Sequence, residues 1–354
     1  PLEALRLGMR VHASELLPVA YVLLKAVLEY PRKYGNTLAR DLEKWGKHVI
    51  EKLRRDPEIR ELYDEEVSVY IGSWEVKCLN CGRWTPLIGN YWLARTKDSS
   101  GRYKRLAYMY PVIKENKVEI GIKDLNEELK VPGGEIHRVI RRVDPKRGLI
   151  EVEGKGVFEV PRPNVEARRN NATCLLCGSN LRFVDQHGNH YPEKKGRKNL
   201  EWYVKWALKK YNEGDERFAR QRLLVKVKVV NGDLVFEPCC DEDQEKLERA
   251  KEYVKELIEK GDPDIPIEMI PPYGNMTQYG LGYPVQVLSK FYQLFNPRQL
   301  LTLVKLVKLI REAGKLIEKE KIEEGLTREE TFKYAEAVVT YLGIALVRFV
   351  DHNN

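Results

Sequence analysis

Two short sequence repeats carry residue types that could hold a metal ion. Each is a pair of cysteines separated by two residues and followed by glycine: Cys78-Leu-Asn-Cys81-Gly82 and Cys174-Leu-Leu-Cys177-Gly178. Such a turn presents two thiolates together, and the glycine lets the chain turn back so that backbone N–H groups point at the sulfurs. Two of these turns supply the ligands of a tetrahedral zinc site. The sequence therefore predicts one zinc ion bound by Cys78, Cys81, Cys174 and Cys177.

The two pairs lie far apart in the sequence, unlike those of a compact zinc ribbon. One ion that joins them would tie together the two ends of an inserted subdomain. Two alternatives remain open. The four thiols could be unrelated core cysteines, or Cys174 and Cys177 could form a local finger with His187 and His190. The local finger leaves the first pair of cysteines without partners, and its histidines lie in what reads as a polar turn.

The remaining two cysteines, Cys239 and Cys240, are adjacent in the sequence. Adjacent side chains diverge, so this pair is predicted to be buried or free rather than to bind one ion. Six cysteines in 354 residues, without a signal-peptide pattern, argue against a disulfide scaffold. The predicted location is a reducing cytoplasm.

The composition is that of a folded protein of two or three domains. Hydrophobic residues make up 43% of the chain and charged residues 32%, and the net charge is +8. The most apolar stretch, Ala337–Val350, is too short to span a bilayer, so no membrane partner is predicted. Abundant Lys and Glu with few Gln are typical of thermophilic proteins.

Positive charge is concentrated between Val165 and Val230, where 15 Lys and Arg face seven Asp and Glu. This balance of +8 equals the net charge of the whole chain. Cations grouped in this way suit the phosphates of a nucleic acid. The residues predicted to bind nucleic acid are those of the densest run, Lys194, Lys195, Arg197 and Lys198.

Aromatic residues follow this run at helical spacing, with Trp202, Tyr203 and Trp206 among lysines. Exposed rings could stack on unpaired bases. Alternatively, they form the core-facing stripe of an amphipathic helix whose lysines point to solvent, which is the favoured interpretation.

The first residues suggest a different kind of site. Pro1–Leu7 is predicted to form a short helix that ends at Gly8, and Met9–Ser14 a buried strand. Glu15 would then lie at the carboxyl end of the strand, before a helix that runs to about Glu29. In an open α/β sheet, an acid at that place can accept hydrogen bonds from both hydroxyls of a ribose. A helix N-cap or a solvated turn is the alternative role for this acid.

Several segments resemble one family, the adenine-specific DNA methylases that contain a Zn-ribbon. The resemblance covers most of the chain and is carried by Pro1–Gly8, Ala13–Ala20, Trp74–Cys81, Asn171–Cys177 and Leu294–Leu300. It implies S-adenosylmethionine as cofactor, bound in part by Glu15, zinc in a ribbon, and DNA as substrate. The implied fold class is α/β, with a partial Rossmann-like methyltransferase core, a β-rich zinc-ribbon insertion and C-terminal helices.

The resemblance also implies two motifs that are not found in this sequence. One is a Gly-rich loop that precedes the first helix and holds the methionine part of the cofactor. The other is an Asp/Asn-Pro-Pro-Tyr/Phe tetrapeptide that binds the target amine and stacks on the flipped base. Ile270-Pro-Pro-Tyr273 is a poor match, because isoleucine cannot accept a hydrogen bond and the family's tetrapeptide follows the Leu294–Leu300 segment. The expectation is therefore an internal fragment, inactive by itself and without catalytic residues.

Four domains are predicted on this basis. Residues 1–65 would be the partial cofactor-binding core, 66–185 the zinc-ribbon insertion, 186–260 a basic helix, hairpin and helix, and 261–354 a Pro/Gly-rich loop and a helical segment. Asn231-Gly232-Asp233 predicts the hairpin turn. Asn296 and Thr327 are predicted to cap the last two helices.

The predicted function is S-adenosylmethionine-dependent DNA adenine-N6 methylation, with a zinc ribbon that helps to hold DNA. Restriction or defence proteins are predicted as further partners. Two alternatives stay open: an RNA or tRNA methyltransferase, and a non-enzymatic zinc-ribbon adaptor that binds nucleic acid.

Overall fold

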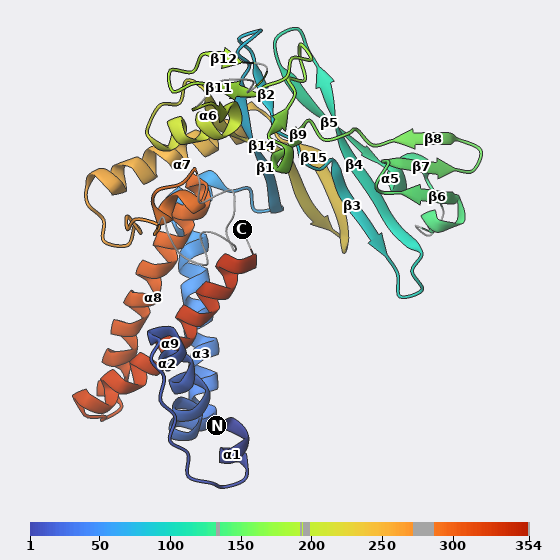
Figure 1. The fold of residues 1–354 in the computed structure, drawn as a ribbon. Coiled ribbons are helices and arrows are strands. Elements are labelled where there is room, and N and C mark those ends of the chain that lie inside the picture. Colours follow the sequence, from blue (N-terminus) through green and yellow to red (C-terminus); the bar gives the residue numbers. More distant parts are fainter. Residues whose placement is uncertain (132–134, 192, 194–198, 272–286, 353–354) are drawn as a thin grey trace. The chain divides into compact units, whose positions relative to one another are not determined.

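A computed structural model describes residues 1–131, 135–191, 193, 199–271 and 287–352. Helices and strands are mixed, which agrees with the α/β class in its broad sense (Figure 1). The chain divides into two compact units. Unit 1 comprises Pro1–Tyr63, Glu248–Pro266 and Phe295–Asn354, and unit 2 comprises Asp64–Leu247 and Ile267–Leu294. The four domain boundaries predicted from the sequence stay a prediction.

The regular secondary structure in the described residues of unit 1 is all helical. One long helix begins after a π-helical turn at Lys25–Glu29, and helix α7 starts in unit 2 and continues into unit 1 from Glu248 onward. The helices are α1 (Leu2–Arg6), α2 (Pro18–Leu24), α3 (Tyr30–Arg55), α4 (Pro57–Leu62), α7 (Asp241–Glu259), α8 (Pro297–Glu323) and α9 (Arg328–His352).

Both predicted caps are confirmed. The Asn296 side chain accepts a hydrogen bond from the Gln299 N–H at 3.0 Å, and the Gln299 side chain accepts one from the Asn296 N–H at 3.0 Å. At α9, the Thr327 N–H donates to the Glu330 carboxylate at 3.0 Å, and the Glu330 N–H donates to the Thr327 hydroxyl at 3.3 Å. These reciprocal bonds satisfy N–H groups that a helix leaves open at its start.

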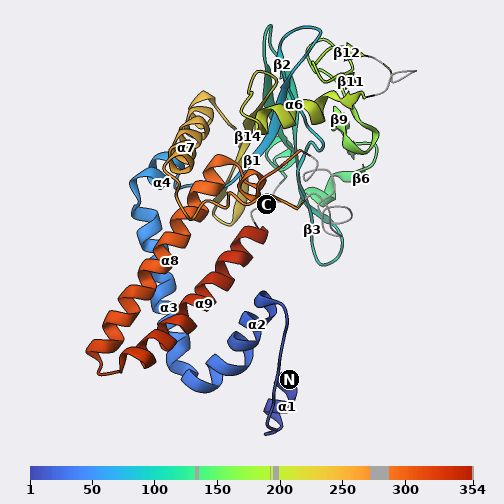
Figure 2. The ribbon, with the colours of Figure 1, turned by 60° about the vertical axis from the view of Figure 1, so that its left-hand side comes forward.

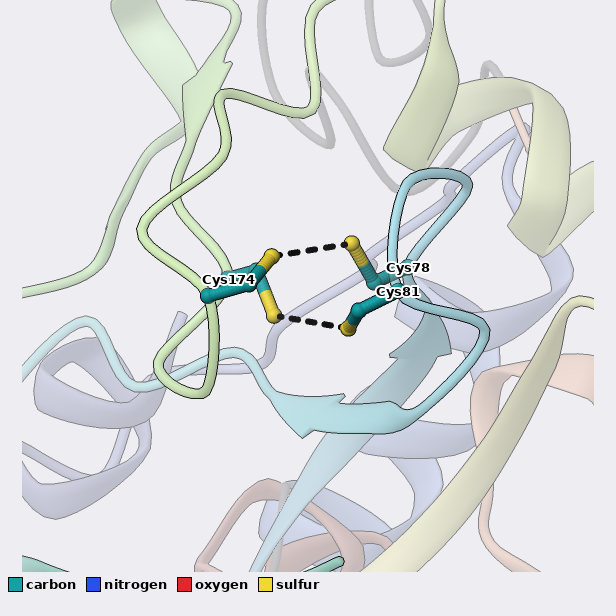
Figure 3. A group of neighbouring side chains, drawn as sticks. Cys78, Cys81 and Cys174 are labelled. Atoms are coloured by element: carbon teal, nitrogen blue, oxygen red, sulfur yellow. Dashed lines mark hydrogen bonds between the residues drawn. The ribbon is translucent and has the colours of Figure 1, made fainter.

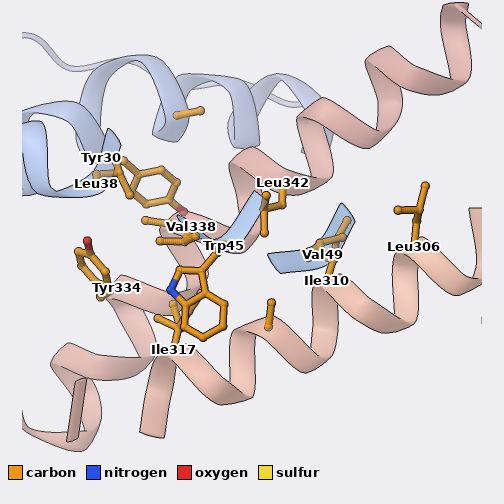
Figure 4. Close-up of a cluster of buried hydrophobic side chains, with 14 residues drawn as sticks. Tyr30, Leu38, Trp45, Val49, Leu306, Ile310, Ile317, Tyr334, Val338 and Leu342 are labelled. Atoms are coloured by element: carbon orange, nitrogen blue, oxygen red, sulfur yellow. The ribbon is translucent and has the colours of Figure 1, made fainter. Parts of the chain in front are cut away.

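The core of unit 1 lies between α3, α8 and α9 (Figure 4). Helix α3 contributes Leu38, Trp45 and Val49, which recur at helical spacing as predicted and are at most 6% exposed. They pack against side chains from α8 and α9 such as Ile317 and Val338, both fully buried. Apolar burial over three long helices is therefore the main stabilising contribution in this unit.

An ionic group borders this core. The Asp41 carboxylate accepts a hydrogen bond from the Tyr334 hydroxyl at 2.7 Å and lies 3.1 Å from the Lys321 Nζ. Burial raises the pKa of Asp41, but the bonds from Tyr334 and Lys321 outweigh it and hold the pKa below its ordinary value. The group contributes stability above the ordinary carboxyl pKa of about 4 and loses that stability as pH falls through the folded-state pKa.

Asp41→Asn is expected to lower the free energy of unfolding at pH 7 by about 1–3 kcal/mol, because Lys321 keeps its charge and loses a partner. The acid side of the stability profile should also become flatter, since one carboxyl with a lowered pKa is gone. Urea unfolding between pH 3 and pH 7 measures both effects. Glu51→Gln is the control, because Glu51 is exposed on α3 and forms no ion pair within the described residues. If the free energy of unfolding falls as steeply at acid pH in Asp41→Asn as in the unaltered chain, Asp41 does not have this role.

The strand predicted at Met9–Ser14 is not formed. These residues have no regular secondary structure, and all except Val11 are exposed. A strand needs hydrogen bonds from a neighbouring strand, and no described strand pairs with this segment. Glu15 therefore does not lie at the carboxyl end of a strand. The short helix before Gly8 is confirmed as α1, and Gly8 adopts the positive φ of 79° that ends it.

Unit 2 is built from antiparallel strands, and it confirms the predicted β-rich region after residue 66. Its sheets have the orders β15-β14-β1-β2, β3-β4-β5, β6-β7-β8 and β12-β11-β13, with a separate pair β10-β9. The strands are β1 (Val67–Lys77), β2 (Trp84–Pro86), β3 (Trp92–Lys97), β4 (Tyr103–Ile113), β5 (Val118–Asp124), β6 (Ile140–Asp144), β7 (Leu149–Val152), β8 (Gly156–Glu159), β9 (Val165–Glu166), β10 (Asn171–Ala172), β11 (Phe183–Val184), β12 (His190–Tyr191), β13 (Glu201–Trp202), β14 (Ala219–Val230) and β15 (Asp233–Pro238).

Short helical elements complete unit 2. They are α5 (Leu125–Leu129), α6 (Tyr203–Asn212) and single 3₁₀ turns at Ile136–Arg138, Ala167–Arg169 and Phe291–Leu294. The predicted turn between β14 and β15 is confirmed, with positive φ angles of 52° at Asn231 and 82° at Gly232. Two consecutive positive φ angles are typical of the hairpin turn that Asn-Gly favours.

Candidate metal centre

The two cysteine pairs lie on matching turns. In the first turn, the Gly82 N–H donates to the Cys78 carbonyl at 2.8 Å, and in the second the Gly178 N–H donates to the Cys174 carbonyl at 2.9 Å. Both glycines have positive φ angles, 69° and 73°. A side chain would strain this backbone, so the glycine after each pair is required by the turn.

The folded chain brings all four sulfurs together (Figure 3). Cys78 Sγ lies 3.7 Å from Cys177 Sγ, and Cys81 Sγ lies 3.8 Å from Cys174 Sγ. All four atoms lie within 4.8 Å of one another. A tetrahedron with zinc–sulfur bonds of about 2.3 Å has sulfur–sulfur edges of about 3.8 Å. The arrangement therefore fits a four-coordinate ion, and the four cysteines could hold a metal such as zinc.

The pKa values of the thiols differ between the buried cysteines, Cys78 and Cys174, and the exposed Cys177. Burial raises the pKa of Cys78 to about 12 and also raises the pKa of Cys174. Burial acts in the same direction on Cys177, but hydrogen bonds with Ser179 and with the neighbouring Cys174 and Cys78 outweigh it and lower the pKa of Cys177 to about 6. Two buried thiols of this kind become thiolates when a cation replaces their protons, so metal binding here should release protons.

Neighbouring polar groups hold the two turns in register. The Asn80 side chain donates to the Ser179 hydroxyl at 2.9 Å, which links the first turn to the second. The Leu175 N–H donates to the Thr85 hydroxyl at 3.0 Å, and Thr85 is fully buried on β2. The hydroxyl of the fully buried Tyr203 donates to the Lys77 carbonyl, directly before the first cysteine. These contacts join segments distant in sequence, and nothing in the local pattern indicated them.

A buried carboxylate lies on the strand that leads into the first turn. Glu75 is 1% exposed and accepts hydrogen bonds from Arg220 at 2.7 Å and Arg222 at 2.5 Å, both on β14. The Arg220 guanidinium also lies over the Trp84 ring, 4.4 Å from its centre. Trp84 pairs with Lys77 across β1 and β2. The ion-pair group of Glu75, Arg220 and Arg222 therefore fixes the strands that position Cys78. It was not predicted from the sequence.

The other cysteines and the histidines do not join this group. His187 and His190 are absent from the only set of potential metal ligands found among the described residues. The Asp185 carboxylate instead accepts hydrogen bonds from the N–H groups of His187 and Asn189, which is the polar turn that the sequence suggested. Cys240 Sγ lies 3.2 Å from an Asp243 carboxylate oxygen.

Trp202 at the end of β13 and the rings of Tyr203 and Trp206 on α6 form core and do not present a stacking surface. Trp202, Tyr203 and Trp206 are 3%, 0% and 6% exposed, and they pack in one cluster with Cys78 and Cys174. The favoured sequence interpretation of these rings is thus confirmed. The three rings therefore pack in the same cluster as one cysteine of each turn.

The predicted nucleic-acid contacts are only partly within the described residues. Lys194, Lys195, Arg197 and Lys198 lie outside them. The lysines of α6 are described, and each forms an ion pair: Lys205 and Lys209 both approach Glu201, at 3.2 Å and 2.7 Å, and Lys210 lies 2.7 Å from Glu213. Much of the positive charge on this helix is therefore balanced.

The predicted cofactor residue, Glu15, is exposed, and its carboxylate accepts one hydrogen bond, from the Leu16 N–H at 2.9 Å. In the Ile270-Pro-Pro-Tyr273 tetrapeptide, Ile270 is 5% exposed and its N–H donates to the Ser289 carbonyl at 2.8 Å. The second proline and Tyr273 lie outside the described residues.

No helix among the described residues has the length and apolar character needed to cross a membrane. Comparisons of this chain with protein-family models, curated proteins and solved structures found no match.

Proposed function

We propose that this chain is part of an S-adenosylmethionine-dependent DNA adenine-N6 methyltransferase in which zinc organises an inserted subdomain. The observation that carries the proposal is the meeting of two cysteine turns, distant in sequence, at the spacing of a four-thiolate site. The segments around both turns, Trp74–Cys81 and Asn171–Cys177, are among those that resemble adenine-specific DNA methylases containing a Zn-ribbon.

The zinc in this proposal has a structural role. Four thiolates complete the tetrahedral coordination of zinc and leave no position for water or substrate, which is typical of structural sites. The ion joins the end of β1 to the turn after β10. It therefore closes the subdomain between these two points and fixes the surface that the subdomain presents to DNA.

The proposed chemistry is a direct displacement. S-adenosylmethionine supplies the methyl group on a sulfonium, and the adenine amine attacks it in a pocket shielded from water. Residues 1–65 contribute to a Rossmann-like cofactor domain in this proposal, and the Glu15 carboxylate accepts hydrogen bonds from the ribose hydroxyls. Its exposure leaves the carboxylate accessible to a ligand.

The test of the proposed function is transfer of labelled methyl groups from S-adenosylmethionine to duplex DNA, by this 354-residue chain and by the full product of its gene. The proposal requires label in N6-methyladenine in at least one of the two. Label in RNA alone would replace it with the RNA or tRNA methyltransferase alternative. Tight nucleic-acid binding without any transfer by either protein would favour the adaptor. Co-purification with restriction or defence proteins tests the proposed partners.

Glu15→Ala is expected to weaken S-adenosylmethionine binding to the methylating protein by about 1–3 kcal/mol, because two ribose hydroxyls lose their acceptor. Isothermal titration calorimetry measures the change. The control is Glu3→Ala, since Glu3 is also exposed and pairs with Arg6 on α1. Equal cofactor affinity in Glu15→Ala and the unaltered protein would remove Glu15 from the site.

A further inference from the structure

The β3–β4 ribbon, residues Trp92–Ile113, is a two-stranded hairpin in which β3 forms one edge of its sheet and β4 pairs with β5 from Ala107 onward (Figures 1 and 2). Near its turn the residues Arg95, Thr96 and Lys97 are all exposed. Successive side chains on a strand point to opposite faces, so three exposed residues in a row mean that both faces of β3 meet solvent there. Among the described residues, no other layer of the unit therefore covers the end of the ribbon.

The ribbon carries a dense positive charge. Between Trp92 and Arg105 it has five Lys and Arg against one Asp. Two of these cations are paired: Arg102 lies 3.0 Å from the Asp98 carboxylate, and Arg105 pairs with the buried Asp124. The other three, Arg95, Lys97 and Lys104, form no ion pair within the described part of the chain and are all exposed.

Aromatic rings order two of these free cations without neutralising them. The Arg95 guanidinium lies 5.5 Å from the centre of the Trp92 ring, and Lys97 Nζ lies 4.6 Å from the centre of the Tyr103 ring. A cation held over a ring keeps its full charge for a partner. The α6 lysines differ, because Lys205 and Lys209 share Glu201 and Lys210 pairs with Glu213.

Asp98, the acidic residue at the turn, repels an anionic partner only weakly. The Asp98 carboxylate accepts hydrogen bonds from the N–H groups of Ser100 and Arg102 and from the Arg102 side chain. Its negative charge is thus stabilised by hydrogen bonds within the turn. The exposed Ser99 and Ser100 form the outermost part of the ribbon.

We propose that the β3–β4 ribbon enters the major groove of duplex DNA and that Arg95, Lys97 and Lys104 contact the flanking phosphates. The major groove is about 12 Å wide and admits a two-stranded β-ribbon. Serine hydroxyls at the turn can donate to or accept from base edges there. The choice of DNA as the polymer rests on the proposed function.

The first test neutralises the three cations in the triple variant R95Q/K97Q/K104Q. Each phosphate contact contributes about 0.9 to the slope of log affinity against log salt, so the slope should fall by about 2.7 and affinity at low salt by at least about tenfold. Fluorescence anisotropy with a labelled duplex and the zinc-loaded 354-residue chain measures both. Zinc content and thermal unfolding of the variant should match those of the unaltered chain.

The matched control is K315Q/K319Q/R328Q, which removes the same charge from three exposed cations on α8 and α9. It should bind DNA with nearly the slope and affinity of the unaltered chain. If the two triple variants weaken DNA binding equally, the ribbon contributes only to the overall charge of the chain, and the proposal is overturned. A ribbon variant that binds normally, or an unaltered chain that does not bind duplex DNA, would also overturn it.

The second test addresses the groove. Methyl green, which occupies the major groove, should displace the unaltered chain, whereas netropsin, which occupies the minor groove, should not. The reverse pattern, or tighter binding to RNA than to duplex DNA, would overturn the placement. Methyl transfer separates this proposal from the proposed function. If DNA binding depends on the ribbon but no methyl group is transferred, the ribbon proposal holds and the proposed function fails. If methyl groups are transferred without dependence on the ribbon, the proposed function holds and the ribbon proposal fails.

Discussion

Replacing Cys174 with serine is expected to reduce the zinc content from about one ion per chain to near zero. Serine is a poor ligand for zinc, and three remaining thiolates leave an incomplete tetrahedron. A ligand present at about 1,000 times its dissociation constant stabilises the folded state by about 4 kcal/mol, and the variant should lose stability of that order. Metal analysis and thermal unfolding, each with and without added zinc, measure the two losses.

Cys240→Ser is the matched control for this change. Unlike the buried Cys174, Cys240 is exposed, and it lies beside Asp243 and outside the four-sulfur group. Its zinc content and its response to a chelator should be those of the unaltered chain. Zinc retained in full by Cys174→Ser, or lost equally from Cys240→Ser, would contradict the assignment of the ligands.

Removal of the Glu75 carboxylate is expected to have the second-largest effect. Glu75→Ala leaves Arg220 and Arg222 without their shared acceptor beside the strand that leads to Cys78. Breaking a buried ion pair costs about 3–5 kcal/mol. Both arginines keep part of their solvent contact, with side chains 46% and 21% exposed, so a loss of about 2–3 kcal/mol is expected here. Urea unfolding of the zinc-loaded chain measures it.

Glu66→Ala serves as the control for Glu75→Ala. The Glu66 side chain is 82% exposed and lies 3.5 Å from Lys228, so its removal should change stability little. If Glu75→Ala unfolds at the same urea concentration as Glu66→Ala, the Glu75 group does not fix the strands around the metal centre.

Local signals in the sequence predicted the elements that depend on local backbone geometry. The glycine after each cysteine pair indicated a turn that needs positive φ, and Gly82 and Gly178 have it. Asn231-Gly232 indicated a hairpin for the same reason. Asn296 and Thr327 indicated helix starts because their side chains bond to N–H groups within three residues. In each case, the residues that determine the structure are neighbours.

Long-range pairing could not be predicted in this way. Glu75 meets Arg220 and Arg222 only because β1 pairs with β14, and the register of that pair shifts between Ile71 and Gly72. The predicted strand at Met9–Ser14 was wrong for a related reason, since an apolar pattern supplies no neighbouring strand.

Net charge along the sequence was likewise an incomplete guide to a binding surface. It pointed to Val165–Val230, but two lysines of α6 pair with Glu201. The free cations Arg95 and Lys97 lie in a shorter segment that the charge count did not single out. Which cations stay unpaired depends on contacts that only the fold reveals.

The central claim is that Cys78, Cys81, Cys174 and Cys177 together bind one zinc ion. X-ray absorption at the zinc edge of the purified 354-residue chain tests it most directly, because it reports the type, number and distance of the atoms bound to the metal. We predict four sulfur neighbours at about 2.3 Å and no nitrogen or oxygen neighbour. Two sulfurs with two nitrogens would indicate the histidine finger instead, and a chain that purifies and folds without zinc would contradict the claim altogether.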